Sequence, residues 1–137
     1  MELPDLISEW VRYSKTDVDI AKQLNENMHP RPLEAICYHA QQSAEKALKA
    51  FLIQCDIVPP KTHDLNRLCE ICTQNDGDFI RIAPLCGTLN RYSNMPRYPF
   101  EIEVFESDAE AAIRNADAIY KWTIEKLSES LPQESSS

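Results

Sequence analysis

Hydrophobic residues recur every three or four positions over several long segments of the chain, which is the period of helices that bury one face. The first segment, 4–27, begins with Pro4, and a proline suits the first turn of a helix. The second segment, 32–56, is the most regular, because its apolar side chains fall within an arc of about 120° on a helical wheel, wide enough to face a core. Its apolar positions are Leu33, Ile36, Cys37, Ala40, Ala44, Ala47, Leu48, Phe51, Leu52 and Cys55. Two long amphipathic helices are therefore predicted in the N-terminal half.

Two shorter helices are predicted in the middle of the chain. The first spans 63–73, with Thr62 as its N-cap, since a threonine hydroxyl can accept a hydrogen bond from the first turn. The second runs from residue 79 or 81 to residue 92. Pro84 lies within it, and a proline removes a hydrogen-bond donor from a helix interior, so a kink or a late start near Pro84 is predicted.

A last helix is predicted over 108–128. Ser107 and Glu110 have the S-x-x-E spacing of a capping box, in which each side chain bonds a free backbone N–H at the start of the helix. The preceding EIEVF stretch, 101–105, is the longest alternation of apolar and polar residues, and an extended linker is expected there. The residues after the helix, 129–137, have no periodicity and are expected to be disordered.

These elements predict an all-α protein, a four- to five-helix antiparallel up-and-down bundle formed by residues 1–128. The length of 137 residues fits one domain, and the presence of only 2 glycines favours long helices over sheets with tight hairpins. The apolar runs are too short for a transmembrane span. The N-terminal stretch MELPDLISEW carries acids and lacks the apolar region of a signal peptide, so a cytoplasmic location without membrane contact is expected.

The formal net charge of −8 argues against indiscriminate binding to nucleic acid, which depends on neutralising many phosphates, and no DNA partner is expected. A local basic pocket is compatible with this charge. The five cysteines, an odd number, indicate reduced thiols. Cys69 and Cys72 form a C-x2-C pair, but on a helix they share a face, and no second pair stands at zinc-finger spacing. Buried helical cysteines are expected, with no metal site and no cofactor.

The polar side of the second predicted helix is the first candidate site. His39, Gln42, Lys46 and Lys49 fall within an arc of about 80°, roughly opposite the apolar stripe, and Glu45 borders them. A histidine, an amide and two ammonium groups together suit a phosphate or a carboxylate-bearing partner. In the alternative interpretation this is a solvated face, on which Glu45 and Lys49 form an i, i+4 ion pair.

Two loops contain further candidates. His63 is at the start of the third predicted helix, where it could cap the helix, bind a ligand or take a proton, and a structural role at the helix start is the preferred interpretation. Arg97 and Tyr98 are enclosed by Pro96 and Pro99, which excludes them from a helix interior. Tyr98 is expected either to pack over one end of the bundle or to stack on a ligand.

Three motifs in this order, HAQQSAEKALKAFL (39–52), KTHDLNRL (61–68) and RYP (97–99) before an alanine-rich last helix, resemble the HEPN domain family of small prokaryotic proteins. The resemblance implies a four- or five-helix bundle that usually dimerises. It also implies a gene often placed beside that of a minimal nucleotidyltransferase, in a toxin–antitoxin pair, and a proposed affinity for nucleotides or RNA. Many members of the family are metal-independent ribonucleases with an R-x4–6-H motif.

That ribonuclease motif is missing from this sequence. No histidine follows Arg97, and Arg31 is separated from His39 by seven residues, one too many. No catalytic residue is therefore carried over from the family. The positions that do match are His39, Gln42, Glu45, Lys46, Lys49, Lys61, His63, Asp64, Arg97 and Tyr98.

The resemblance therefore implies a dimeric, non-catalytic module that binds nucleotide or phosphate, or that interacts with a minimal nucleotidyltransferase. The residues expected to bind the ligand are His39, Gln42, Lys46, Lys49, Lys61, His63, Arg97 and Tyr98. The first alternative is a metal-independent endoribonuclease with a non-standard active site, in which His39 or His63 acts as acid and base and Arg97 stabilises charge. The second is a scaffold, in which Arg97 pairs with Glu45 or Asp64.

Overall fold

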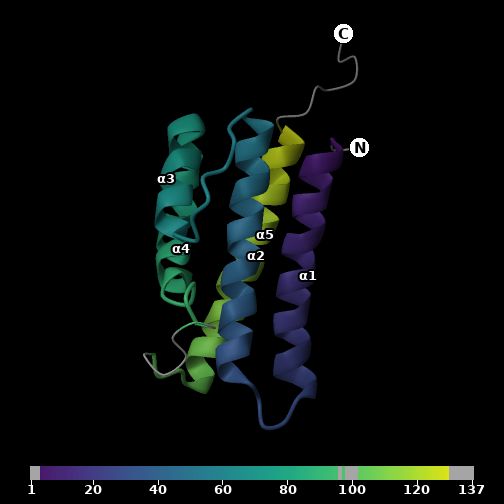
Figure 1. Ribbon diagram of the computed structural model, residues 1–137, viewed down its shortest axis with the longest axis vertical. Helices are drawn as coiled ribbons and strands as arrows, with labels where there is room; N and C mark the ends of the chain where they lie inside the picture. Colours follow the sequence, from purple (N-terminus) through teal and green to yellow (C-terminus); the bar gives the residue numbers. More distant parts are fainter. Residues whose placement is uncertain (1–3, 96, 98–101, 130–137) are drawn as a thin grey trace.

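The computed structural model describes residues 4–95, 97 and 102–129, and every regular element within them is a helix. The elements are α1 (Asp5–Asn27), α2 (Leu33–Gln54), α3 (Leu65–Asn75), the 3₁₀ helix η1 (Gly77–Ile82), α4 (Ala83–Asn90) and α5 (Glu106–Glu129). The predicted fold class, an all-α bundle of four to five helices, is confirmed (Figure 1). Tyr98 lies outside the described residues, as does the predicted tail apart from Glu129 at the end of α5.

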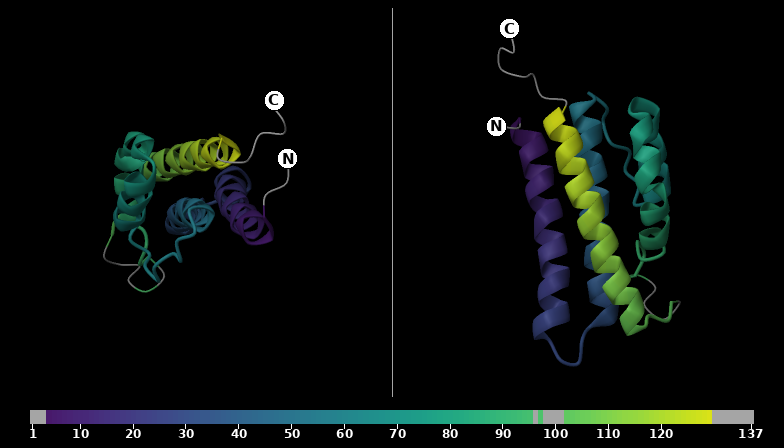
Figure 2. Two further views of the ribbon diagram at one scale, coloured as in Figure 1. Left: turned by 90° about the horizontal axis from the view of Figure 1, so that it is seen from above. Right: turned by 180° about the vertical axis from the view of Figure 1, so that it is seen from behind.

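Helix α2 lies at the centre of the bundle. It contacts α1, α3, α4 and α5, and α1 and α3 lie on opposite sides of it (Figures 1 and 2). Helix α5 contacts α1 and α4 as well as α2, so the shorter α3 and α4 cover the side of α2 that α1 and α5 leave open. A central helix covered from several directions buries polar side chains together with its apolar ones.

The connection 55–64 doubles back along α2. Nε2 of Gln41 donates a hydrogen bond to the backbone oxygen of His63 (3.2 Å), which places the end of the connection beside the middle of α2. Sγ of Cys72 bonds the backbone oxygen of Leu48 (3.7 Å), further along α2. Helix α3 therefore runs in the same direction as α2, whereas the pairs α1 and α2, α3 and α4, and α4 and α5 are antiparallel (Figure 1).

The N-cap of α3 is Asp64, so the prediction of Thr62 in this role is wrong. The Asp64 carboxylate accepts hydrogen bonds from the backbone N–H groups of Asn66 (3.0 Å) and Arg67 (3.3 Å). Thr62 Oγ1 accepts instead from the N–H of Asp64 (3.1 Å). A carboxylate at a helix N-terminus also interacts favourably with the helix dipole, which favours the aspartate over the hydroxyl two residues earlier.

The start of α5 also differs from the prediction. The helix begins at Glu106, so Ser107 is already helical and is not its N-cap. The Asp108 carboxylate accepts a hydrogen bond from the backbone N–H of Phe105 (2.9 Å). In the predicted capping box, Glu110 was expected to make the corresponding bond to the N–H of the N-cap residue. This bond is made by the residue three positions after the N-cap, and because α5 begins one residue earlier than Ser107, that residue is Asp108.

The late start predicted near Pro84 is confirmed. Helix α4 begins at Ala83 with Pro84 in its first turn, where a missing N–H costs no helical hydrogen bond. The preceding η1 places Phe79 in the core, with its ring centroid 4.3 Å from that of Phe51 and 6.2 Å from that of Trp122. This aromatic cluster joins η1 to both α2 and α5.

The predicted apolar stripe of α2 is buried from Ile36 to Leu52, and Leu33 and Cys55 at its two ends are half-buried. The opposite side of α2 is less exposed than the sequence pattern indicates, because α1 and the 55–64 connection lie against it. Its buried polar residues are Gln41, Ser43, Glu45 and Lys49. Over the ranges that the structure describes, none of the helices combines the length and the apolar character needed to cross a membrane.

Candidate functional site

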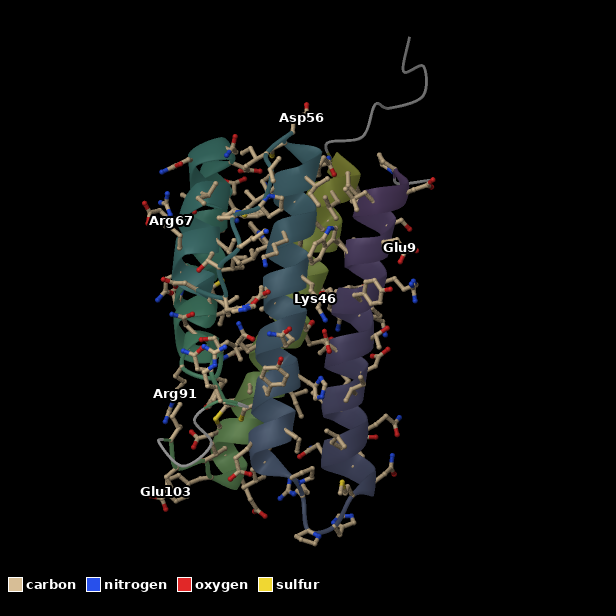
Figure 3. The ribbon with its side chains drawn as sticks, viewed as in Figure 1. Glu9, Lys46, Asp56, Arg67, Arg91 and Glu103 are labelled. Carbon is tan, nitrogen blue, oxygen red and sulfur yellow. The ribbon has the colours of Figure 1, made fainter. Side chains whose placement is uncertain are left out.

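Asp17 of α1 lies against α2 and binds two of the predicted site residues. Its Oδ1 is 3.0 Å from Nδ1 of His39, and its Oδ2 is 2.5 Å from Nζ of Lys46. Figure 3 shows Lys46 midway along α2. Burial raises the pKa of Asp17, but the hydrogen bonds from His39 and Lys46 outweigh burial and hold this pKa below its ordinary value. Asp17 is therefore a buried, ionised carboxylate.

Glu45, the residue next to Lys46 on α2, is the centre of a second cluster. Its Oε1 is 2.9 Å from Nδ1 of His63 and 3.3 Å from Nε2 of Gln41, and its Oε2 is 3.0 Å from Nζ of Lys49. The side chains of Glu45 and Lys49 are 5% and 10% exposed, whereas that of His63 is 64% exposed. The cluster therefore has a buried carboxylate at its base and an imidazole at its solvent side.

Gln41 fixes the histidine loop to the helix. It is fully buried, and besides its contact with Glu45 it donates to the backbone oxygen of His63. Its own Oε1 accepts from Nε2 of Gln42 (2.8 Å). The amide thus has hydrogen-bond partners at both ends, as a buried polar group requires, and it holds the backbone of His63 beside α2.

The two clusters face different neighbours because consecutive residues of a helix point about 100° apart. Lys46 is directed to α1, and Glu45 is directed to the 55–64 connection. Two aromatic side chains of α1 lie beside the lysines: Nζ of Lys46 is 5.9 Å from the ring centroid of Tyr13, and Nζ of Lys49 is 5.8 Å from the ring of Trp10. These distances are within the range of cation–π contacts. Lys49 contacts both Trp10 of α1 and Glu45, so it joins the two clusters. We call the joined group the α1–α2 seam, although His63 belongs to the 55–64 connection; its residues are Trp10, Tyr13, Asp17, His39, Glu45, Lys46, Lys49 and His63.

Both histidines of the seam are held in the same way. An ionised carboxylate can only accept hydrogen bonds, so the Nδ1 atom facing it carries the proton. Within the described ranges of the chain, Nε2 of His39 and Nε2 of His63 form no hydrogen bond with protein. In each ring Nε2 is thus available to a ligand, as an acceptor when the ring is neutral and as a donor when it is protonated.

Both lysines on the polar side of α2 are paired with buried carboxylates, Lys46 with Asp17 and Lys49 with Glu45. In the solvated-face interpretation, the i, i+4 pair of Glu45 and Lys49 is confirmed, but this pair is buried rather than solvated. Two lysines balance two carboxylates, so the net charge of the seam is decided by His39 and His63. The helical wheel placed these residues correctly on α2 and could not show what covers them.

The other predicted residues are more scattered. Gln42 is half-buried beside Gln41, and Lys61 is exposed on the 55–64 connection. Arg97 is exposed, and its backbone N–H donates to the oxygen of Asn94 (3.0 Å). The proposed pairs of Arg97 with Glu45 or Asp64 are not formed, since those carboxylates are occupied by other partners. Glu45 binds Lys49, His63 and Gln41, and Asp64 binds Asn66, Arg67 and Asn90.

Sequence reasoning missed Asp17 as a site residue. The signal was a pair of polar residues on the apolar side of the first helix: Ser14 and Asp17 are buried together with Val18 and Ala21. Ser14 donates a hydrogen bond to the backbone oxygen of Ser43 on α2 (2.7 Å), and the Asp17 carboxylate accepts hydrogen bonds from His39 and Lys46. A carboxylate in a buried stripe needs a cationic or hydrogen-bonding partner on the facing helix, and α2 has such residues.

The all-helical bundle with a polar central helix defines the class of protein, and comparison with known proteins gives the family. The HEPN domain model matches residues 7–127, so the chain belongs to the HEPN domain family. Two solved structures are similar: ST0689, an archaeal HEPN homologue (22% identity, TM-score 0.69), and TT1696 from Thermus thermophilus (21% identity, TM-score 0.68). Each alignment covers 88% of this chain and 97% of the other. Comparison with curated proteins gave no match.

Proposed function

We propose that this HEPN domain protein is a non-catalytic module that binds nucleotide or RNA phosphate at the α1–α2 seam. The observation that carries the proposal is the shared geometry of His39 and His63, each fixed at Nδ1 by a carboxylate and open at Nε2. A protonated imidazole held in this way donates a charge-assisted hydrogen bond to a phosphate oxygen. Because Lys46 and Lys49 neutralise the two carboxylates, the incoming anion meets a site without excess negative charge.

The energetics of the seam support a role beyond holding the bundle together. Buried ion pairs lose much of their Coulomb energy to desolvation, and apolar residues of similar volume are often equally stabilising or better. Lys49 and Glu45 are nonetheless both buried in the middle of α2. A cost of this kind is expected where the charges position a group that does something else, and here that group is His63.

Aromatic side chains beside the seam support a nucleotide rather than a simple phosphate ion. Tyr13 is 48% exposed and Trp10 is half-buried, so part of each side chain is accessible to a ligand, and the Arg12 guanidinium lies 4.6 Å from the Tyr13 ring centroid. Stacking of a base on an aromatic ring is worth about 1–3 kcal/mol and tolerates any base. The exposed cations Lys61 and Arg97, together with Gln42 and Tyr98, are assigned as further ligand contacts of the same module.

A calorimetric titration tests the binding proposal. ATP, GTP and a short RNA are titrated in turn into the wild type, into a His39→Asn/His63→Asn double variant and into His29→Asn, which changes an exposed histidine of the α1–α2 loop. We expect binding heat with at least one ligand in the wild type and in His29→Asn, and its loss in the double variant. Absence of heat with all three ligands in the wild type would overturn the proposal, as would equal binding by the double variant.

We further assign the protein to a cytoplasmic two-component system, as a homodimer acting with a minimal nucleotidyltransferase. This assignment is supported by membership of the HEPN domain family. A nucleotidyltransferase gene beside the gene of this protein and a dimeric mass by light scattering are the expected findings. A monomer that does not bind the product of any neighbouring gene would contradict it.

A second candidate function is a metal-independent endoribonuclease, and one contact favours it. The Glu45–His63 pair has the geometry of a general acid and base whose second nitrogen is oriented by a carboxylate. Purified protein incubated with total tRNA in EDTA would then cleave the RNA, His63→Asn would lose this activity, and His29→Asn would retain it. Intact RNA at high protein concentration would exclude the candidate.

A further inference from the structure

An apolar hollow adjoins the α1–α2 seam near the start of α1. It has a volume of about 510 Å³ and lies between α1, the last turn of α2 and the beginning of the 55–64 connection. Apart from Asp56, its lining residues are apolar: Leu6, Trp10, Ile53, Ile57, Val58 and Pro59. Trp10 belongs both to the seam and to the wall of this hollow. A ligand bound at the seam can therefore extend a flat apolar group into the hollow.

The turn after α2 fixes one wall of the hollow. Asp56 has a φ of 60°, in the left-handed region that favours glycine. The backbone N–H groups of Asp56 and Ile57 donate to the oxygens of Ile53 (2.9 Å) and Leu52 (2.9 Å), which are the two bonds of a Schellman motif. A glycine fits this position with less strain than an aspartate. The turn therefore requires the backbone of Asp56 and not its side chain.

The carboxylate of Asp56 is available to a ligand. It is exposed, and no other residue that the structure describes forms a hydrogen bond or an ion pair with it. The two oxygens of a carboxylate can accept two parallel N–H bonds. Among the nucleobases, guanine presents two such donors side by side, N1–H and the 2-amino group, whereas adenine and cytosine present one donor beside an acceptor. The hollow thus pairs an apolar wall with the acceptor that suits guanine.

The hollow and the histidine cluster lie along one line of α2. Glu45, Lys49 and Ile53 are four residues apart, so they follow the same side of the helix, and the eight residues span about 12 Å. His63 is bonded to Glu45 at one end of this line (2.9 Å), and Ile53 lines the hollow at the other. Figure 3 shows Asp56 at the hollow end of α2. A nucleotide extended over its phosphates has a length of this order.

The charges along the line give a bound nucleotide its direction. The ammonium of Lys49 lies between the two ends, 5.8 Å from the ring centroid of Trp10. A phosphate is repelled by the Asp56 carboxylate, and it accepts a charge-assisted hydrogen bond from a protonated His63. This pattern favours a ligand with its phosphates at His63 and its base at Asp56.

We propose that the ligand of the seam is a guanine nucleotide, either free or unpaired in an RNA strand, whose base occupies this hollow. This assignment rests on the proposed function, because it takes the phosphate site at the seam as given. The base stacks against Trp10, and the Asp56 carboxylate accepts hydrogen bonds from its N1–H and 2-amino groups. The phosphates extend past Lys49 to Nε2 of His63.

A calorimetric comparison of ligands tests the base and the phosphates separately. GTP, ITP, ATP and inorganic tripolyphosphate are titrated into the wild type, as are the single-stranded RNAs AAGAA and AAAAA. We expect GTP to bind at least about tenfold more tightly than ATP, since hydrogen bonds to a charged acceptor are lost with adenine. ITP, which lacks the 2-amino group, should bind with intermediate affinity, and tripolyphosphate should bind more weakly than GTP. If the ligand is RNA, AAGAA should bind more tightly than AAAAA.

Two variants of Asp56 separate recognition from stability. Asp56→Gly should not lower the melting temperature, because glycine suits the left-handed position, yet its affinity for GTP should fall to that for ATP. Asp56→Asn keeps the shape of the side chain but replaces one acceptor with a donor, so it should also lose the preference for guanine. Both variants should bind tripolyphosphate as the wild type does. Glu125→Gln, which changes an exposed acid of α5, should retain the preference.

The outcomes distinguish this assignment from the proposed function. Equal affinities for GTP and ATP in the wild type, with no preference between the two RNAs, would overturn the guanine site and leave the phosphate site standing. A guanine preference that persists in Asp56→Gly would overturn it as well, as would tripolyphosphate binding as tight as that of GTP. Absence of binding by all six ligands would overturn the proposed function itself.

Discussion

His39 and Asp17 lie on different helices and are joined by a hydrogen bond of 3.0 Å between Nδ1 and Oδ1. The other oxygen of the same carboxylate holds Lys46. One residue of α1 thus fixes the orientation of two side chains of α2, and the acid that does so is 6% exposed. This arrangement makes Asp17 the organiser of one half of the α1–α2 seam.

Replacing Asp17 with asparagine should destabilise the fold. Lys46 would remain largely covered and without a counter-ion, and breaking one side of a buried pair costs about 3–5 kcal/mol, less where the remaining charge is partly exposed as it is here. We expect the free energy of unfolding in urea to fall by about 2–3 kcal/mol. Asp19→Asn is the matched control, because its ion pair with Lys15 is exposed and worth at most about 1 kcal/mol. Equal losses in the two variants would contradict the assigned role of Asp17.

The stability of the protein should fall in acid, and Asp17 should account for part of the fall. Its pKa in the fold lies below the ordinary value of 3.8, so the folded state binds this proton less readily than the unfolded state does. The stabilisation is present above the unfolded pKa and is lost as the pH falls through the folded pKa. Urea unfolding between about pH 6 and about pH 3 should therefore show a smaller loss in Asp17→Asn than in the wild type. Parallel curves for the two proteins would refute this.

Replacing Glu45 with glutamine should loosen the 55–64 connection as well as lower stability. It leaves the ammonium of Lys49 buried and removes the anion that holds His63, at a cost of about 3 kcal/mol. Amide exchange at Leu65 and Leu68, which report on the start of α3, should become faster. Glu125→Gln changes an exposed acid of α5 and should leave both measurements as in the wild type.

Phe79 is expected to be a main anchor of η1. It is fully buried between Phe51 and Trp122, and truncation of a buried phenylalanine costs about 3–5 kcal/mol. Phe79→Ala should lower the unfolding free energy by this amount and change the fluorescence of Trp122. Ile80→Ala removes the neighbouring side chain, which is 67% exposed, and should cost less than about 1 kcal/mol. A small effect of Phe79→Ala would mean that η1 is not held by the core.

Local patterns in the sequence were sufficient for the helices. The apolar stripe of α2 and the late start at Pro84 depend on side-chain period and on proline geometry, which act over a few residues. Helix ends were predicted less well. Several residues near an end are able to cap it, and the backbone conformation in the folded protein decides which of them does so. At α3 the N-cap is Asp64 rather than Thr62, and at α5 the carboxylate that bonds the N-cap N–H is that of Asp108 rather than Glu110.

About half of the candidate site could be predicted from the sequence. His39, Lys46 and Lys49 were identified from their spacing on one helix, and their placement on one side of α2 required no tertiary information. Their carboxylate partners were not identified in the same way, since Asp17 is on another helix, and the pairing of Glu45 with His63 crosses the 55–64 connection. Residues far apart in sequence meet only when the rotation and packing of the helices are known.

The sequence by itself determined an all-helical bundle, its family motifs and a polar side on its second helix, because periodicity and motif order are properties of the chain. The tertiary structure decided that this polar side is covered and its lysines are neutralised, because α2 became the central helix and the 55–64 connection returned along it. Burial forces charged groups into pairs, and the identity of each pair depends on which helix lies opposite.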